Sequence, residues 1–154
     1  MTCQIVMLPD PVSVRDTALL AEAIDLLFRY RIKNLPVVDA NGIYRGLFGI
    51  HTLIRQLLPR AATLDEGTGL TDLGFVHDTL DNLRDRLAGH MHEPVLQFSD
   101  QTLKPVAPDA SIMETLLRLH RQHLILPVAD PVSGRLLGIV TYWELLARLT
   151  GRTT

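Results

Sequence analysis

Few residues in this chain could bind a metal or act as a nucleophile. Cys3 is the single cysteine, and nothing beside it in the sequence would activate its thiol. The segment His90-Met91-His92-Glu93 could suggest a metal site. Residues two positions apart do not share a helix face, however, and no third ligand cluster lies nearby in sequence. We interpret this segment as a polar helix end and predict no metal site.

The other histidines do not form a catalytic set. His51, His120 and His123 are scattered along predicted helices or their ends. A catalytic nucleophile needs a base within reach and a group that orients the base, and phosphoryl transfer needs a glycine-rich loop. The sequence has neither a Ser-His-Asp order nor such a loop. We therefore predict that the chain is not an enzyme and has no catalytic residues.

Composition indicates a small globular chain with an aliphatic core. The chain has 154 residues, of which 47% are hydrophobic and only 5% aromatic, and its formal net charge is −2. No cluster of Lys and Arg forms a face for phosphates, so nucleic acid is not an expected partner. The N-terminus does not resemble a signal peptide, and no run approaches the roughly 20 apolar residues that span a membrane. We expect a cytoplasmic protein, which the single cysteine also fits.

An internal repeat is the most informative feature of the sequence. Residues 12–58 and 105–149 share one pattern, with a one-residue change of offset that a loop insertion would cause. Equivalent residues include Leu20 and Ile112, Leu35-Pro36-Val37 and Leu126-Pro127-Val128, and Gly46 and Gly138. Self-similarity of this kind indicates a duplicated structural unit.

Each unit has the same predicted order of elements: strand, helix, strand, strand, helix. In the first unit these are a strand around 12–14, a helix capped by Asp16 or Thr17, strands 35–38 and 44–50 around a turn at 39–42, and a closing helix with Leu53, Ile54, Leu57 and Leu58. In the second unit Asp109 or Ser111 is the predicted cap. A unit of this size cannot bury its sheet alone. We predict an α+β fold of two β-α-β-β-α repeats, packed pseudo-symmetrically through their sheets, with a helical insert between them.

The segment between the repeats differs from both. Residues 59–71 are polar, contain glycine and begin with proline, which is typical of a loop. Residues 72–91 carry apolar residues at spacings of three and four, which predicts an amphipathic helix. That helix could lie on the surface of its own chain or contact a second subunit, and its apolar stripe is too short for a coiled coil.

Together these motifs resemble the CBS (cystathionine-β-synthase-type) domain family. The resemblance rests on residues 7–14, the two Leu-Pro-Val motifs, Gly46-Leu47-Phe48-Gly49, and the segment from Gly138 to Glu144. It implies a tandem CBS pair, or Bateman module, with a first repeat at 1–58, a linker at 59–103 and a second repeat at 104–154.

The resemblance also implies a ligand site. Such pairs usually bind AMP, ADP, ATP or S-adenosylmethionine in clefts between the repeats. The family's Gly-hydrophobic-x-Thr/Ser-x-x-Asp element places a hydroxyl near phosphate and a carboxylate on the ribose hydroxyls, a sensible use of both groups. In the second repeat Thr141 matches the hydroxyl, and Glu144 replaces the aspartate with a longer carboxylate. The residues expected to flank the base are Lys104, Val106, Ile125, Leu126 and Pro127.

The first repeat lacks both polar groups of this element. Gly49 stands at the hydroxyl position and Thr52 at the acid position, so we expect at most one competent site in each chain. Candidate phosphate partners are Lys33, Arg121 and His123. A simpler interpretation of Thr141 and Glu144 also stands, because a threonine cap and an acidic first turn stabilise a helix without any ligand.

The implied function is regulatory. Binding of an adenosyl ligand would rearrange the pair, and an effector protein on another chain would respond to the change. The alternative is a structural or oligomerisation module that binds no small molecule. No obligatory cofactor is expected. The family's tendency to pair through its helices implies a homodimer, with an interface from Leu53, Ile54, Leu57, Trp143, Leu145, Leu146 and Leu149.

Overall fold

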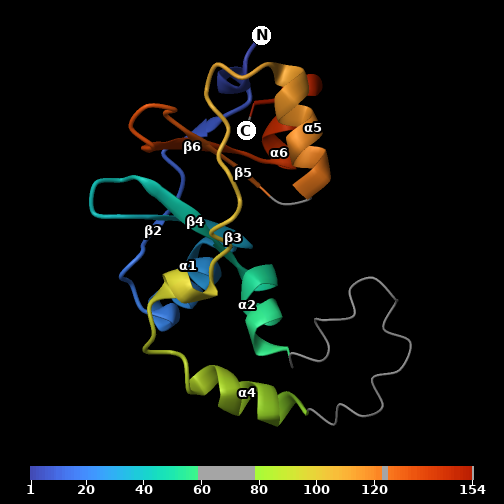
Figure 1. Ribbon diagram of the computed structural model, residues 1–154. Helices are drawn as coiled ribbons and strands as arrows, with labels where there is room; N and C mark the ends of the chain where they lie inside the picture. Colours follow the sequence, from blue (N-terminus) through green and yellow to red (C-terminus); the bar gives the residue numbers. More distant parts are fainter. Residues whose placement is uncertain (59–78, 123–124, 154) are drawn as a thin grey trace.

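Two three-stranded sheets form the centre of the computed structural model, which describes residues 1–58, 79–122 and 125–153 (Figure 1). One sheet has the order β2 (Val14–Arg15), β3 (Asn34–Val38), β4 (Tyr44–Gly49), and the other has the order β1 (Leu8–Pro9), β6 (Leu136–Val140), β5 (Leu126–Ala129). The helices are α1 (Leu20–Tyr30), α2 (Ile50–Leu57), α4 (Leu80–Ala88), α5 (Ile112–Gln122) and α6 (Tyr142–Leu149), with short 3₁₀ helices η1 (Cys3–Ile5) and η2 (Val95–Phe98). The predicted α+β class with two repeats is confirmed.

The two hairpins are shaped by equivalent aspartates. The Asp39 carboxylate accepts hydrogen bonds from the backbone N–H groups of Asn41 (2.8 Å) and Ile43 (3.0 Å), as the turn chemistry predicts. Gly42 has a φ of 79°, a left-handed conformation that glycine adopts without a steric penalty. In the second repeat Asp130 makes the same kind of turn, accepting from Val132 (2.8 Å) and Ser133 (2.9 Å).

Acid is expected to weaken these turns. Backbone hydrogen bonds lower the pKa values of both turn aspartates, Asp39 and Asp130, below the usual value for aspartate. A carboxylate with a lowered folded-state pKa contributes stability above the unfolded-state value of about 3.9, and this contribution is lost as the pH falls through the folded-state pKa. We expect Asp130→Asn to be less stable than the parent protein at pH 7, and the difference in unfolding free energy to shrink below about pH 4. Urea unfolding between pH 7 and pH 3 measures this difference.

The control for this prediction is Asp109→Asn. The exposed Asp109 carboxylate accepts no hydrogen bond within the described residues, so this substitution should leave the acid dependence unchanged. A constant stability difference between Asp130→Asn and the parent protein at every pH would contradict the prediction.

The leading segment of each repeat pairs with the sheet of the other repeat. Strand β1 runs antiparallel to β6, with Leu8 opposite Ile139, so the N-terminal segment lies on the second repeat (Figure 1). In the equivalent place on the first repeat, Asp100 exchanges two backbone hydrogen bonds with Leu47 (2.8 and 3.0 Å). We call residues 1–9 and 91–102 the arms. The chain boundaries predicted for the repeats, at 58 and 104, stay a prediction, but strand pairing groups each arm with the opposite repeat.

The arms also cap the first helix of the repeat that they contact. The first N–H groups of α1, those of Leu20 and Ala21, donate to the carbonyl oxygens of Glu93 (2.9 Å) and Met91 (3.1 Å). The predicted cap by Asp16 or Thr17 is therefore wrong, because the second arm satisfies these donors instead. In the second repeat the Ser111 hydroxyl does accept from the Glu114 N–H at 3.1 Å, as predicted.

This capping explains where the linker helix ends. Residues 72–78 of the predicted helix 72–91 lie outside the described residues. In the described part, the helix α4 runs from Leu80 to Ala88, so it ends before the predicted end at residue 91. The chain then turns, with the Glu93 N–H donating to the His90 carbonyl at 3.0 Å, and the Met91 and Glu93 carbonyls accept hydrogen bonds from α1.

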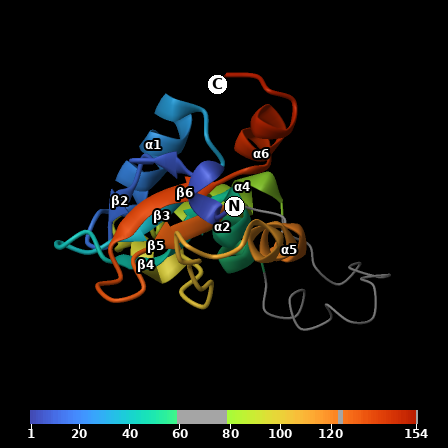
Figure 2. The same cartoon turned by 90° about the horizontal axis from the view of Figure 1, so that it is seen from above.

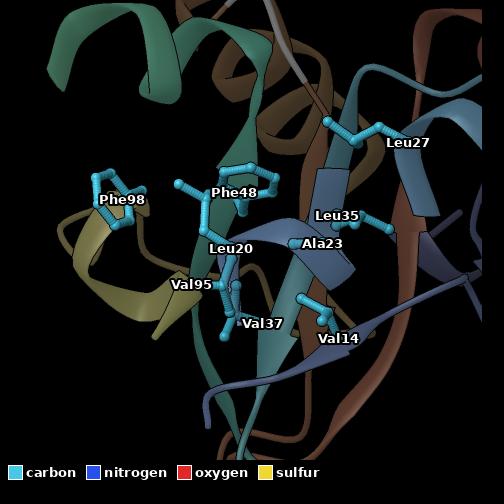
Figure 3. Close-up of a cluster of buried hydrophobic side chains, with 9 residues drawn as sticks. All are labelled: Val14, Leu20, Ala23, Leu27, Leu35, Val37, Phe48, Val95 and Phe98. Atoms are coloured by element: carbon cyan, nitrogen blue, oxygen red, sulfur yellow. The ribbon is translucent and has the colours of Figure 1, made fainter. Parts of the chain in front are cut away.

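Each repeat has its own hydrophobic core, and each core includes residues of an arm. Val95 and Phe98 of the second arm pack with Leu20 and Phe48 in the first repeat (Figure 3). Their equivalents in the first arm are Cys3 and Val6, which pack in the second core. Cys3 is fully buried, and this burial raises the pKa of its thiol, so it is a core residue and not a reactive thiol.

The two hairpins join the repeats at one end of the molecule. The Tyr44 N–H donates to the Gly134 carbonyl (3.0 Å) and the Leu136 N–H donates to the Gly42 carbonyl (2.9 Å), so the hairpin ends lie side by side (Figure 2). The Tyr44 hydroxyl donates to the Leu103 carbonyl at 3.0 Å. These bonds connect the sheets directly. Within the described residues, no helix has both the length and the apolar character needed to cross a membrane.

Candidate functional site

Thr141 and Glu144 lie where β6 ends and α6 begins. Thr141 is the N-cap residue, and its hydroxyl oxygen accepts a hydrogen bond from the Glu144 N–H at 3.2 Å. Glu144 occupies the first turn of α6, where its negative charge is favourable for the helix dipole. Both residues are half-buried. The hydroxyl thus caps the helix, as the simpler interpretation of the sequence expects, while its O–H remains free to donate.

Glu144 lines a cavity of about 140 Å³, and two arginines also line it. The other lining residues are Ala147, Arg148, Arg152 and Thr153. Arg148 lies one turn after Glu144 on the same face of α6. Gly151, with a φ of 67°, turns the chain back, and the Arg152 N–H donates to the Ala147 carbonyl at 2.9 Å.

These three charged side chains carry no charge partner in the described part of the chain. No hydrogen bond or ion pair joins the Glu144 carboxylate or the Arg148 and Arg152 guanidinium groups to another side chain within residues 1–58, 79–122 and 125–153. The cavity therefore presents one acceptor group and two donor groups with a net positive charge. Such a set can bind an anion that also carries hydroxyl groups.

The predicted strand residues lie beside this helix start but are mostly buried. The Val106 N–H donates to the Pro127 carbonyl (2.8 Å), and Leu126 pairs with Val140, so Ile125 and Thr141 lie next to this pair, just outside the strands. Val106 and Leu126 point into the second core, with exposed fractions of 2% and 0%.

Lys104 is exposed, and its carbonyl accepts a hydrogen bond from Arg118. The cavity beside Glu144 includes none of Lys104, Val106, Ile125, Leu126 and Pro127. The structure brings Val106, Leu126 and Pro127 together with Ile125 and Thr141, but it does not join them to the cavity. Their role as a base-binding wall stays a prediction.

The equivalent position in the first repeat is filled by the protein itself. A Cβ atom at Gly49 would lie 2.3 Å from the Asn34 side-chain oxygen and 2.7 Å from the Lys33 carbonyl oxygen, so no hydroxyl-bearing side chain fits there. The Thr52 hydroxyl accepts from the Gly49 N–H (2.9 Å) and donates to the Gly49 carbonyl (3.0 Å). The Thr52 hydroxyl therefore bonds the local backbone, and Gly49 leaves no room for a second polar side chain.

The remaining phosphate candidates are not part of the cavity beside Glu144. Lys33 and Arg121 are exposed, and His123 lies outside the described residues. Sequence reasoning missed Arg148 and Arg152 instead. The four-residue spacing from Glu144 could have indicated Arg148, and the helix-stopping Gly151 could have indicated that Arg152 turns back. No group of three or more His, Cys, Asp or Glu residues in the described segments could hold a metal.

The family model for the CBS domain matches residues 4–59 and 78–151, which is most of the chain. The chain belongs to the CBS domain family. As a CBS pair it has two matched copies, and the second match begins at residue 78, within the segment predicted as linker and before α4.

Solved structures share the fold of this CBS pair. The CBS-pair protein CBSX2 from Arabidopsis thaliana is 18% identical, with a TM-score of 0.73, covering 97% of this chain and 94% of that one. CBSX2 in complex with AMP is 19% identical, with a TM-score of 0.70, covering 97% and 96%. The CBS domain pair of protein MJ0100, in complex with 5-methylthioadenosine and S-adenosyl-L-methionine, is 16% identical, with a TM-score of 0.63, covering 98% and 100%. At these identities the likeness establishes the fold. No match is found among curated proteins.

Proposed function

We propose that this CBS pair is a regulatory module that binds an adenosyl ligand of the AMP, ADP, ATP or S-adenosylmethionine class beside Thr141 and Glu144. Binding rearranges the two repeats, and an effector protein on another chain responds to the new arrangement. The proposal assigns the chain no catalytic role and no obligatory cofactor.

The observation that carries the proposal is a set of charges around one cavity that have no charge partner among the described residues. The Glu144 carboxylate can accept hydrogen bonds from the two ribose hydroxyls, and the Arg148 and Arg152 guanidinium groups can donate to phosphate. Two arginines that line one cavity, with no acidic partner in the part of the chain that the structure describes, repel each other, and an anion relieves this repulsion. The adenosyl ligands of CBSX2 and of MJ0100 are consistent with this class of ligand.

Calorimetric titration of AMP, ADP, ATP and S-adenosylmethionine into the protein tests the proposal. We expect saturable binding of at least one of the four, and a loss of at least about tenfold in affinity in Glu144→Ala, because a charged hydrogen bond contributes about 1.5–3 kcal/mol. The matched control is Glu114→Ala, which removes an exposed glutamate from the first turn of α5 and should leave affinity unchanged.

Absence of heat with all four ligands, from protein shown to be folded and ligand-free, would favour the alternative of a structural or oligomerisation module. That alternative is supported by the capping role of the Thr141 hydroxyl and by Asn34, which occupies the first-repeat position.

We further propose that the chain forms a homodimer through its helices. Apolar side chains are exposed on them, including Trp143 (72%) and Leu149 (74%) on α6 and Ile54 (50%) on α2. Exposed apolar area of this kind favours burial against a second copy. Light scattering at high micromolar concentration should give twice the mass of one chain, and a mass of one chain would contradict the dimer.

A further inference from the structure

A second cavity, over α2, uses helix positions that correspond to those of the cavity beside Glu144, but it has a different opposite wall. Its volume is about 330 Å³, within the range of sites that hold small molecules. Thr52, Arg55 and Gln56 line it from α2, at the positions that Glu144, Ala147 and Arg148 occupy on α6. Its opposite wall is the second arm, from Gln97 to Thr102.

The acid that is missing at Thr52 is present on the opposite wall. Asp100 is held rigidly, because its backbone forms both hydrogen bonds to Leu47 and its carboxylate accepts from the Thr102 N–H (2.9 Å) and hydroxyl (2.6 Å). One carboxylate oxygen, Oδ1, receives both of these bonds. This cavity therefore has a carboxylate in a different place from that of the second repeat.

Arg55 supplies the opposite charge. Burial raises the pKa of Asp100, but the hydrogen bonds from Thr102 and Leu103 and the positive charge of Arg55 together lower it below its usual value, so the carboxylate is ionised at neutral pH. The Arg55 guanidinium donates to the His51 ring nitrogen at 3.2 Å. No ion pair within 4.0 Å joins Arg55 to Asp100 in the described residues, so the two charges face the cavity without neutralising each other directly.

The remaining lining is uncharged and rich in amides. Gln56, Gln97 and Gln101 carry side-chain amides, which both donate and accept hydrogen bonds, and the floor is formed by the buried Thr52 and Phe98. With one positive and one negative group the lining has no net charge, whereas the cavity beside Glu144 has a net positive charge. The two repeats thus offer sites of different electrostatic character.

We propose that the first-repeat cavity binds a small zwitterion of the α-amino acid class, with its carboxylate on Arg55 and its ammonium group on Asp100. A doubly negative phosphate is disfavoured there, because Asp100 repels it, whereas a zwitterion satisfies both charges at once. The glutamine amides suit an amino acid with a polar side chain. This site is separate from the nucleotide site proposed for the second repeat, and neither depends on the other.

Amide chemical-shift titration of the full chain with L-glutamine, L-serine and glycine tests this proposal. Weak affinity is measurable in this way, so each probe is taken to about 20 mM, and binding is expected with a Kd of millimolar or tighter. The shifts should concentrate on residues 52–56 and 97–102. N-acetyl-L-glutamine lacks the ammonium group and L-glutaminamide lacks the carboxylate, and each should bind at least about tenfold more weakly than L-glutamine.

Two variants test the positive and the negative group one at a time, and each should lose at least about tenfold in affinity for L-glutamine. Arg55→Gln removes the exposed cation, and Asp100→Asn keeps an oxygen to accept from Thr102. Arg84→Gln, on α4 outside the cavity, is the control and should bind normally.

Absence of shifts with all three amino acids would overturn the proposal, as would equal binding by the two single-charge analogues. It would also be overturned if AMP or inorganic phosphate shifted residues 52–56 and 97–102 and the amino acids did not. A failure of AMP to shift the residues around Glu144 would count only against the nucleotide site.

Discussion

Gly138→Ala is expected to lower the free energy of unfolding by about 1–3 kcal/mol, the usual cost of forcing an extra methyl group into a packed site. A Cβ atom at this position would lie 2.5 Å from the Leu8 carbonyl oxygen and 2.4 Å from the Met7 side chain. The backbone contact cannot be relieved by a rotamer change, so β1 has to move away from β6. Urea unfolding measures the loss, and limited proteolysis should show earlier cleavage in residues 1–9.

The control is Gly89→Ala. There the closest atom to the new Cβ would be the Arg86 carbonyl oxygen at 3.5 Å, and the backbone is right-handed with a φ of −68°. We expect a change within about 0.5 kcal/mol or a slight gain, because alanine has less backbone freedom to lose on folding. If Gly138→Ala were as stable as the parent protein and equally resistant to protease, the N-terminal arm would not be packed on the second repeat.

Phe48→Ala should destabilise the protein by about 3–5 kcal/mol, the range for a large side chain removed from a core. Phe48 is fully buried and packs in the first-repeat core, where the second arm contributes Phe98 (Figure 3). The loss combines transfer of apolar surface to water with an unfilled cavity. Calorimetric or urea unfolding should show a decrease in the free energy of unfolding, and this decrease is a large part of the total stability of a domain of this size.

The matched control for this prediction is Phe28→Ala, since Phe28 lies on α1 with 79% of its surface exposed. Its removal should change the unfolding free energy by less than about 0.5 kcal/mol in dilute solution. Equal effects of the two substitutions would contradict the assignment of Phe48 to the core. A concentration-dependent effect of Phe28→Ala would instead place Phe28 in a subunit contact.

The local structure of each repeat could be predicted from the sequence, because it depends on short-range rules. Spacings of three and four predicted that Leu20, Ala23 and Leu27 would share the buried face of a helix, and all three are buried in α1. The Asp39 and Asp130 turns followed from residue types that favour them. The duplication predicted two similar units, and the motifs within them indicated the family to which the chain belongs.

The exchange of the arms could not be predicted in this way. Residues 1–9 and 91–102 are short and only partly alternating, so their sequence does not indicate which sheet edge they join. The tertiary structure makes that choice, since an arm must reach a free sheet edge and also cap a helix start, as the Met91 and Glu93 carbonyls do for α1. The same reason explains why the Asp16 or Thr17 cap and the end of the linker helix were mispredicted.

The same distinction between local motifs and long-range contacts applies to the candidate sites. The motif around Thr141 and Glu144, and the loss of its polar groups in the first repeat, are visible in the sequence because they lie within one strand-to-helix junction. The charged groups that share a cavity with these positions cannot be identified from the motif alone. Arg152 shares a cavity with Glu144 because Gly151 turns the chain back. Asp100 shares a cavity with Arg55 because its backbone pairs with Leu47 of β4, far away in the sequence. Sequence therefore determined the repeats and their local motifs, whereas long-range packing decided which charged groups share a cavity, because that depends on contacts that no local pattern encodes.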